Sequence, residues 1–235
     1  PMIRAVHAAL LEWRDDPAVT AVLVTSTSDR AFCAGGDVKP VREAALAGDF
    51  DAVREAFADE YRLDELVAGY PKPYLAVLDG VTMGGGLGIS VHGAVRVTTE
   101  RTTMAMPETA IGFVPDVGSS HFLPRLRGTT ARCDAVGMYL GLTGSRIDAG
   151  DALAVGLTTH YVPSARIGEF ADRVRSGHWR DALDEFVEPA PESTLAQRFT
   201  DIEKVFGDGT VLEMVARLDR LDDIDPEWAE RTRTT

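Results

Sequence analysis

The stretch DGVTMGGGLG, residues 79–88, decides the fold of this chain. It follows an apolar run at 74–78 that predicts a strand, and its three consecutive glycines let backbone N–H groups approach a ligand without interference from a Cβ atom. A helix is predicted to begin at these glycines, and the free N–H groups of a helix N-terminus favour negative charge. Taken by itself, the segment is a tight strand-to-helix connection.

A second glycine turn, FCAGGD at residues 32–37, follows another predicted strand at 21–25. A strand followed by a glycine turn therefore occurs twice, and two such turns could share one oxyanion. Neither turn matches GxGxxG or a Walker A sequence, which disfavours a nucleotide phosphate site. The alternative for each turn is a connection with no ligand.

A third segment, MPETAIGFVPDVG at residues 106–118, places Glu108 and Asp116 among apolar side chains. Burial would raise the pKa of such carboxyl groups, which suits acid/base or nucleophilic chemistry. The alternative is a glutamate at a helix N-terminus and an aspartate in a turn.

Strand and helix signals alternate along the first part of the chain, which predicts an α/β fold. After residue 164 only helical patterns remain. The sequence therefore predicts a core over residues 1–163 and a helical region over residues 164–235. The helical spacing at 3–13 has no N-cap before it, and no stop signal precedes Thr235, so we expect segments to be missing at both ends. The elements expected are a strand at 94–98 and helices at 41–47, 51–67, 167–174, 195–206 and 211–221.

Composition narrows the classes of protein that fit. The formal net charge of −13 opposes binding to nucleic acid. The longest apolar runs fall far short of the ~20 residues that span a bilayer, so no membrane association is expected. Two cysteines, Cys33 and Cys133, are too few for a disulfide framework and form no metal-ligand pattern. We therefore expect a cytoplasmic protein without a metal site.

The order and spacing of the three motifs resemble the crotonase (enoyl-CoA hydratase/isomerase) superfamily from about residue 20 to residue 165. The resemblance implies a spiral of ββα units with a helical C-terminal region, assembled as a homo-oligomer, commonly a trimer. It also implies an acyl-CoA substrate, with coenzyme A as part of the substrate and no other cofactor. The oxyanion donors would be the backbone N–H groups of Gly36 and Gly85, each typically worth about 3 kcal/mol in catalysis.

Within the superfamily, the sequence is most similar to the 3-hydroxyisobutyryl-CoA hydrolases. Hydratases carry a glutamate where this chain has Gly88, whereas Glu108 is retained. The segments PKPY at 71–74 and SVHG at 90–93 resemble the corresponding segments of the hydrolases. The resemblance implies that Glu108 attacks the thioester carbonyl or activates a water, and that Asp116 handles protons or orients the substrate hydroxyl. It further implies substrate contacts by Ala34, Asp37, Gly84 and His121.

Two departures from the hydrolase pattern bear on the acyl chain. Asp64 stands where the family usually has asparagine, and Ser119-Ser120 stands where glycines are common. Both departures leave the reaction class unchanged but put the acyl-chain preference in question. Valine catabolism follows from the resemblance alone.

Other functions remain open at this stage. An enoyl-CoA hydratase or isomerase could use Glu108 as its base, and a catalytically silent acyl-CoA-binding protein could share the same fold. A serine hydrolase is disfavoured, because Gly88 to His92 lacks the last glycine of Gly-x-Ser-x-Gly.

Several residues have plainer interpretations. Lys39, Arg42 and Lys72 could pair with the phosphates of coenzyme A, although solvated surface cations are the expected reading. His92 is expected to be structural. Cys33 has no partner base nearby and is not expected to be a nucleophile.

Overall fold

The computed structural model describes residues 2–128, 134–220 and 225–234, and its strands alternate between two parallel sheets. The odd-numbered strands form one sheet in the order β1-β3-β5-β7, and the even-numbered strands form the other in the order β2-β4-β6. The strands are β1 (Val22–Val24), β2 (Ala31–Cys33), β3 (Tyr74–Leu78), β4 (Val81–Met83), β5 (Val95–Thr98), β6 (Thr103–Ala105) and β7 (His160–Tyr161).

This alternation means that the chain winds as a spiral, adding one strand to each sheet per turn. Val22 pairs with Tyr74 and Leu75 with Val95, so each strand meets its sheet neighbour one turn later along the chain. The structure thus confirms the α/β class and the spiral of ββα units. The strands at Ala31–Cys33 and Val81–Met83 were not expected from the sequence. Each is short and adjoins a glycine-rich stretch, so the sequence pattern predicted only a turn there.

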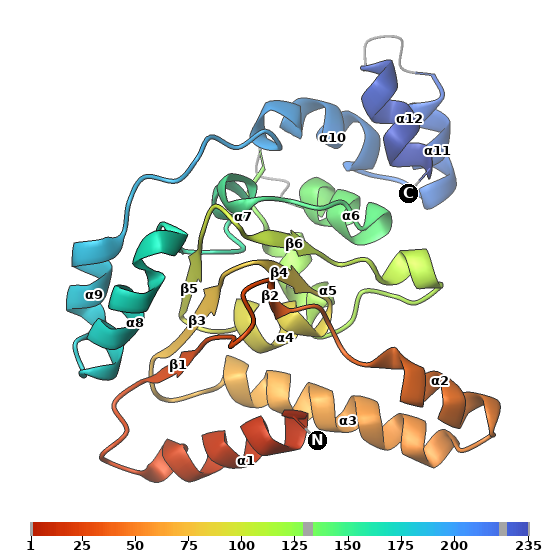
Figure 1. The fold of residues 1–235 in the computed structure, drawn as a ribbon. Helices are drawn as coiled ribbons and strands as arrows, with labels where there is room; N and C mark the ends of the chain where they lie inside the picture. Colours follow the sequence, from red (N-terminus) through yellow and green to blue (C-terminus); the bar gives the residue numbers. More distant parts are fainter. Residues whose placement is uncertain (1, 129–133, 221–224, 235) are drawn as a thin grey trace.

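Helices surround the two sheets (Figure 1), and α3 runs the length of one side. Asp49 caps its N-terminus by accepting a hydrogen bond from the backbone N–H of Ala52, and Gly69 ends it. The helices are α1 (Met2–Asp15), α2 (Val38–Leu46), α3 (Phe50–Ala68), α4 (Gly85–Val91), α5 (Ser119–Phe122), α6 (Asp134–Thr143), α7 (Ala149–Val155), α8 (Ile167–Arg175), α9 (Trp179–Phe186), α10 (Phe199–Phe206), α11 (Val211–Leu218) and α12 (Pro226–Thr234), with short 3₁₀ turns η1 (Glu108–Ile111), η2 (Leu123–Arg125), η3 (Ser164–Arg166) and η4 (Ala196–Arg198).

The three-stranded sheet brings the three sequence motifs together. Because β2, β4 and β6 are parallel neighbours, their carboxyl ends lie at one edge. The first glycine turn leaves β2 there, the triple glycine leaves β4, and the Glu108 segment leaves β6. Ligands commonly bind outside the carboxyl ends of parallel strands, so this edge is where a site is expected.

Both faces of strand β3 are buried, which explains its unbroken apolar run. Tyr74, Ala76 and Leu78 point into the main core, and Leu75 and Val77 point into a second cluster on the opposite face. The second cluster is closed by apolar residues of α8 and α9, such as Phe170 and Phe186.

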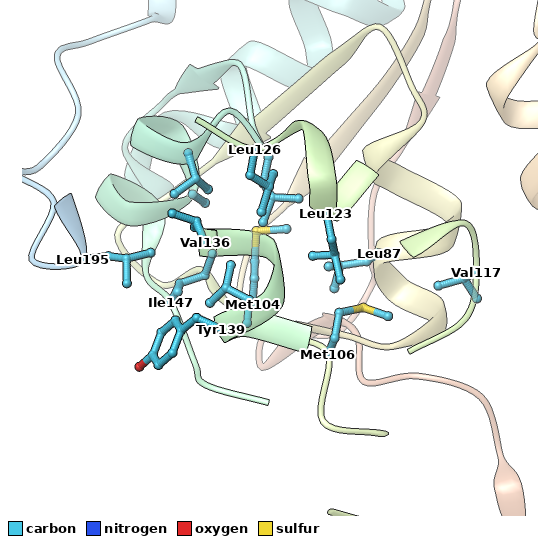
Figure 2. Close-up of a cluster of buried hydrophobic side chains, with 14 of the residues drawn as sticks. Leu87, Met104, Met106, Val117, Leu123, Leu126, Val136, Tyr139, Ile147 and Leu195 are labelled. Atoms are coloured by element: carbon cyan, nitrogen blue, oxygen red, sulfur yellow. The ribbon is translucent and has the colours of Figure 1, made fainter. Parts of the chain in front are cut away.

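The main core fills the space between the sheets, α3, α4, α6 and α10. Figure 2 shows part of it, with Met104 of β6 and Leu87 of α4 near Leu123, and with Val136 and Tyr139 presented by α6. Residues of the C-terminal helices belong to the same core, including Ile202 and Trp228.

The part of the chain after residue 164 contains only helices among its described residues, as the sequence pattern predicts. These helices share both clusters with the sheets, so the division into a core at 1–163 and a region at 164–235 stays a prediction. Cys133 and Leu221, which figured in the sequence predictions, lie outside the described residues. Among the described helices, none combines the length and apolar character needed to cross a membrane.

The two glycine turns pack backbone against backbone, which leaves no room for side chains. A Cβ atom on Gly86 would lie 2.4 Å from the carbonyl oxygen of Cys33. We expect Gly86→Ala to lower the free energy of unfolding by about 2–4 kcal/mol, because neither backbone can move aside. The measurement is urea unfolding followed by circular dichroism.

The matched control for that variant is Gly168→Ala. Gly168 lies in α8 and a Cβ there meets nothing within 4 Å. Alanine in a helix should stabilise by about 0.5–1 kcal/mol. Equal effects of the two substitutions would contradict the backbone contact described here.

Candidate active site

The glycine turns at the carboxyl ends of β2 and β4 lie against each other. A Cβ on Gly85 would come 3.5 Å from the backbone nitrogen of Gly36, and a Cβ on Gly35 would come 4.0 Å from that of Gly85. Gly35 and Gly84 both adopt positive φ, of 107° and 51°, which side chains disfavour. The two residues predicted as oxyanion donors are therefore brought together.

Glu108 opens the η1 turn and is only 8% exposed. A Cβ on Gly84 would lie 2.8 Å from Glu108 Oε1, so the carboxyl group reaches the triple-glycine turn. Its Oε2 atom is buried without a hydrogen-bond partner in the described structure. Burial raises the pKa of Glu108, and the nearby Asp116 and Glu60 raise it further.

Asp116 is held by a hydrogen bond from the hydroxyl group of Tyr61, at 2.8 Å. The next residue, Val117, is 2% exposed and has a φ of 45°, which is rare for a β-branched residue. His92 Nε2 lies 2.9 Å from the carbonyl oxygen of Val117 and fixes this strained turn. The predicted structural role of His92 is therefore consistent with its contacts, and these contacts set the position of Asp116.

Two carboxylates of α3 lie beside these residues. A Cβ on Gly85 would lie 2.4 Å from Glu60 Oε1, and one on Gly36 would lie 3.9 Å from both Glu60 oxygens. Asp64, one helical turn further on, is buried and touches α4 in the same way at Gly88. Glu60 was not among the residues predicted from the sequence. Its spacing of four residues from Asp64, on a helix whose Leu63 is buried, was the available signal.

Ionising Glu60, Asp64 or Glu108 costs more because other carboxyl groups lie nearby. Burial is the main cause of the raised pKa of Glu60 and of Asp64, and Asp116 adds to both. The pKa of Asp64 rises to about 7. Several carboxyl groups with raised pKa values in one place are typical of catalytic sites.

A pocket of about 560 Å³ opens between α3 and the segment that carries Asp116. Asp64, Tyr61 and His92 line it together with residues 114–121. Glu108 and the two glycine turns are not part of this lining; Glu60 reaches the turns from α3, the helix that forms one side of the pocket.

The remaining predicted substrate contacts divide between two places. His121 lines the pocket and Gly84 touches Glu108. Ala34 is exposed on the first glycine turn, and Asp37 caps α2 by accepting a hydrogen bond from the backbone N–H of Lys39. The carboxylate of Asp37 is thus used to start a helix, and its predicted contact with substrate remains untested.

The candidate phosphate-binding cations lie outside the pocket lining. Lys39 and Arg42 are exposed, in line with the expectation of solvated cations. Lys72 is half-buried and donates hydrogen bonds to the carbonyl oxygens of Trp13 and Asp16, which fixes the end of α1. Lys72 is thus a surface cation whose ammonium group is also bound by backbone carbonyl oxygens. In the described ranges, His, Cys, Asp and Glu side chains form no group of three or more able to hold a metal ion.

Known proteins similar to this chain come from one family. The family described as "Enoyl-CoA hydratase/isomerase" matches residues 1–235. The 3-hydroxyisobutyryl-CoA hydrolase, mitochondrial, of Gallus gallus is 39% identical over 232 residues, covering 92% of this chain and 57% of the relative. The protein of the same name from Xenopus tropicalis is 47% identical over 166 residues, covering 71% of this chain and 41% of the relative.

Two solved structures share the fold along almost the whole chain. A carnitinyl-CoA dehydratase from Mycobacterium thermoresistibile superposes with a TM-score of 0.90 at 38% identity, covering 98% of this chain and 66% of that one. An enoyl-CoA hydratase from Rhodobacter sphaeroides 2.4.1 has a TM-score of 0.90 at 35% identity, covering 99% and 65%. The chain spans about half the length of the curated relatives it matches.

The raised pKa of Asp64 predicts that the free energy of unfolding depends on pH. Because its pKa rises from 3.8 to about 7 on folding, ionisation opposes the folded state. The free energy of unfolding should therefore fall as pH rises from about 4 to about 7. Asp64→Asn removes this loss, so the variant should gain of the order of 2–4 kcal/mol on wild type between pH 4 and pH 8.

The measurement is urea unfolding of both proteins across that range. Asp64→Leu, which also lacks the charge, should gain on wild type by a similar amount over the same range despite its different packing. A gain that appears in only one of the two variants would mean that shape, and not the charge, causes the effect.

Proposed function

The chain belongs to the enoyl-CoA hydratase/isomerase family, and from that premise we propose that it hydrolyses short 3-hydroxyacyl-CoA thioesters, with 3-hydroxyisobutyryl-CoA as the best candidate. The observation that carries the proposal is the buried, partly unpaired carboxyl group of Glu108 beside the two glycine turns. The names of the curated relatives support the choice of hydrolysis over the other reactions of the family.

In this proposal the thioester oxygen accepts hydrogen bonds from the N–H groups of Gly36 and Gly85. The negative charge that develops there is stabilised by donors already in place. Glu60, whose carboxyl group touches both turns, would contact the acyl group bound there.

Glu108 acts either as the nucleophile or as the base. As nucleophile, its carboxylate bonds to the thioester carbon, the carbon–sulfur bond breaks, and the coenzyme A thiolate leaves; water then cleaves the acyl-enzyme anhydride. As base, it removes a proton from the attacking water. Both routes need ionised Glu108, so kcat/KM should rise with pH through its raised pKa.

In the same proposal, Asp116 handles the second proton or orients the substrate. Its carboxylate is bound by Tyr61 and lines the pocket that would take the acyl chain. We therefore assign it the transfer of a proton to the leaving group or the positioning of the acyl hydroxyl.

Hydration or dehydration is the second candidate. It is favoured by the two structures with TM-scores of 0.90, which are named as a carnitinyl-CoA dehydratase and an enoyl-CoA hydratase. An isomerase that uses Glu108 alone, or a silent acyl-CoA-binding protein, would share the same turns.

The proposal also covers the cofactor, the assembly and the cellular compartment of the enzyme. We propose that it needs no cofactor beyond the coenzyme A of its substrate and that it works as a homo-oligomer in the cytoplasm, with a place in valine catabolism. Low cysteine content and the free thiol of Cys33 support a reducing compartment. The animal relatives are named as mitochondrial, so their compartment differs from the one proposed.

The test is a thiol-release assay on 3-hydroxyisobutyryl-CoA with the full-length protein. Glu108→Gln and Asp116→Asn should each lower kcat by about 10²–10⁴-fold, because each removes a group that moves a proton or forms a bond. Glu169→Gln, an exposed carboxylate of α8, is the control and should match wild type.

Crotonyl-CoA hydration is followed in parallel with the same proteins. Release of coenzyme A by wild type, with little hydration, supports the hydrolase. Hydration or isomerisation without release of coenzyme A would refute the hydrolase and favour the second candidate.

A further inference from the structure

Asp64 is a buried carboxyl group that the proposed chemistry leaves unused. It is 5% exposed, and neither of its oxygens has a hydrogen-bond partner in the described part of the chain. It nevertheless lines the 560 Å³ pocket, next to Tyr61 and Asp116. A buried polar group without a partner costs about 1–3 kcal/mol, which makes its retention at a pocket wall informative.

The place of Asp64 depends on the glycine at position 88. A Cβ on Gly88 would lie 2.7 Å from Asp64 Oδ1 and 2.7 Å from Val117 Cβ. Any side chain at position 88 would therefore collide with Asp64 or with the turn that positions Asp116. Because position 88 is glycine, the carboxyl group of Asp64 can occupy this end of the pocket.

The separation between Asp64 and the two glycine turns can be followed along the packed helices α3 and α4. On α3, Asp64 lies four residues after Glu60, which touches Gly36 and Gly85. On α4, Gly88, which touches Asp64, lies three residues after Gly85. Both paths amount to about one helical turn, roughly 5 Å.

That separation suits a substituent near the start of the acyl chain. With the thioester oxygen on the glycine turns, a hydroxyl group on the third acyl carbon would reach a group one helical turn away and form a hydrogen bond of about 2.7–2.8 Å with it. A bare hydrocarbon chain would leave Asp64 unpaired.

We propose that Asp64 is the specificity residue of this site, and that its carboxyl group binds the hydroxyl substituent of a 3-hydroxyacyl chain. The proposal rests on the acyl-CoA substrate of the proposed function and names the group that selects it. It holds for hydrolysis and for dehydration alike, because both begin with a 3-hydroxyacyl thioester.

The chemistry of the carboxyl group fits a hydroxyl ligand in either protonation state. With a pKa of about 7, Asp64 is present in both forms at neutral pH. The neutral form donates one hydrogen bond and accepts another, and the ionised form accepts the hydroxyl proton. A site with an unpaired polar group discriminates against a ligand that lacks the matching hydroxyl.

The experiment compares 3-hydroxyisobutyryl-CoA with isobutyryl-CoA, which differs only in the hydroxyl group, in the full-length protein. The readout is the ratio of kcat/KM values for the two thioesters. We expect a ratio of about 10–100 for wild type. Asp64→Leu and Asp64→Ala should reduce it to about 1, and Asp64→Asn should restore most of it, because an amide also donates and accepts. An unchanged ratio in Asp64→Leu and Asp64→Ala overturns the proposal.

A binding measurement separates this proposal from the proposed function. Calorimetry in the Glu108→Gln background gives Kd for both thioesters without turnover, and the same ratio should fall when Asp64→Leu or Asp64→Ala is added. If wild type releases no coenzyme A but the Kd ratio depends on Asp64, only the hydrolase assignment fails. If it releases coenzyme A and both ratios ignore residue 64, only the role of Asp64 fails.

The control is Glu55→Gln, another carboxylate of α3. Glu55 is exposed and pairs with Arg4, away from the pocket lining. Its substitution should leave both ratios at the wild-type value. A fall equal to that of Asp64→Leu would show a general effect of charge on α3 and would also overturn the proposal.

Discussion

The parallel pairing of β2, β4 and β6 is the constraint on which the rest of the structure depends. It sets three carboxyl ends at one edge, and each end leads directly into one motif. Contact between the backbones of the two glycine turns then requires glycine at position 86. The sheet thus sets how close the two turns lie to each other.

The carboxyl groups are crowded at this edge at a cost to stability. Glu60, Asp64 and Glu108 all have raised pKa values, chiefly through burial, and Asp116 raises each further. The causes that raise these pKa values are burial and neighbouring carboxylates. Groups kept against such a penalty are commonly those that bind or react.

The sequence predicted the candidate site best where a strand is followed directly by a glycine turn. The turns at 32–37 and 79–88 and the carboxylates Glu108 and Asp116 could be predicted to converge, because their order matched a known pattern. The strands Ala31–Cys33 and Val81–Met83 could not be, since three residues beside glycines carry too little periodicity. Glu60 and the burial of Asp64 were hidden as well, because an acidic pair on a helix is usually solvated and only the packing against α4 shows that these two are not.

The spiral also governs how such a chain can fold. Among the described strands, none pairs with its immediate successor in sequence. Val22 of β1 pairs with Tyr74 of β3, and Leu75 of β3 pairs with Val95 of β5. Each turn must close a long loop before its hydrogen bonds form, which places the protein among slow folders of high contact order. Ile202 of α10 and Trp228 of α12, far along the chain from the first strands, belong to the same core. A chain that has built the edge carrying the glycine turns, but not yet the helices α10 and α12, therefore still exposes apolar surface of the core and is prone to aggregation.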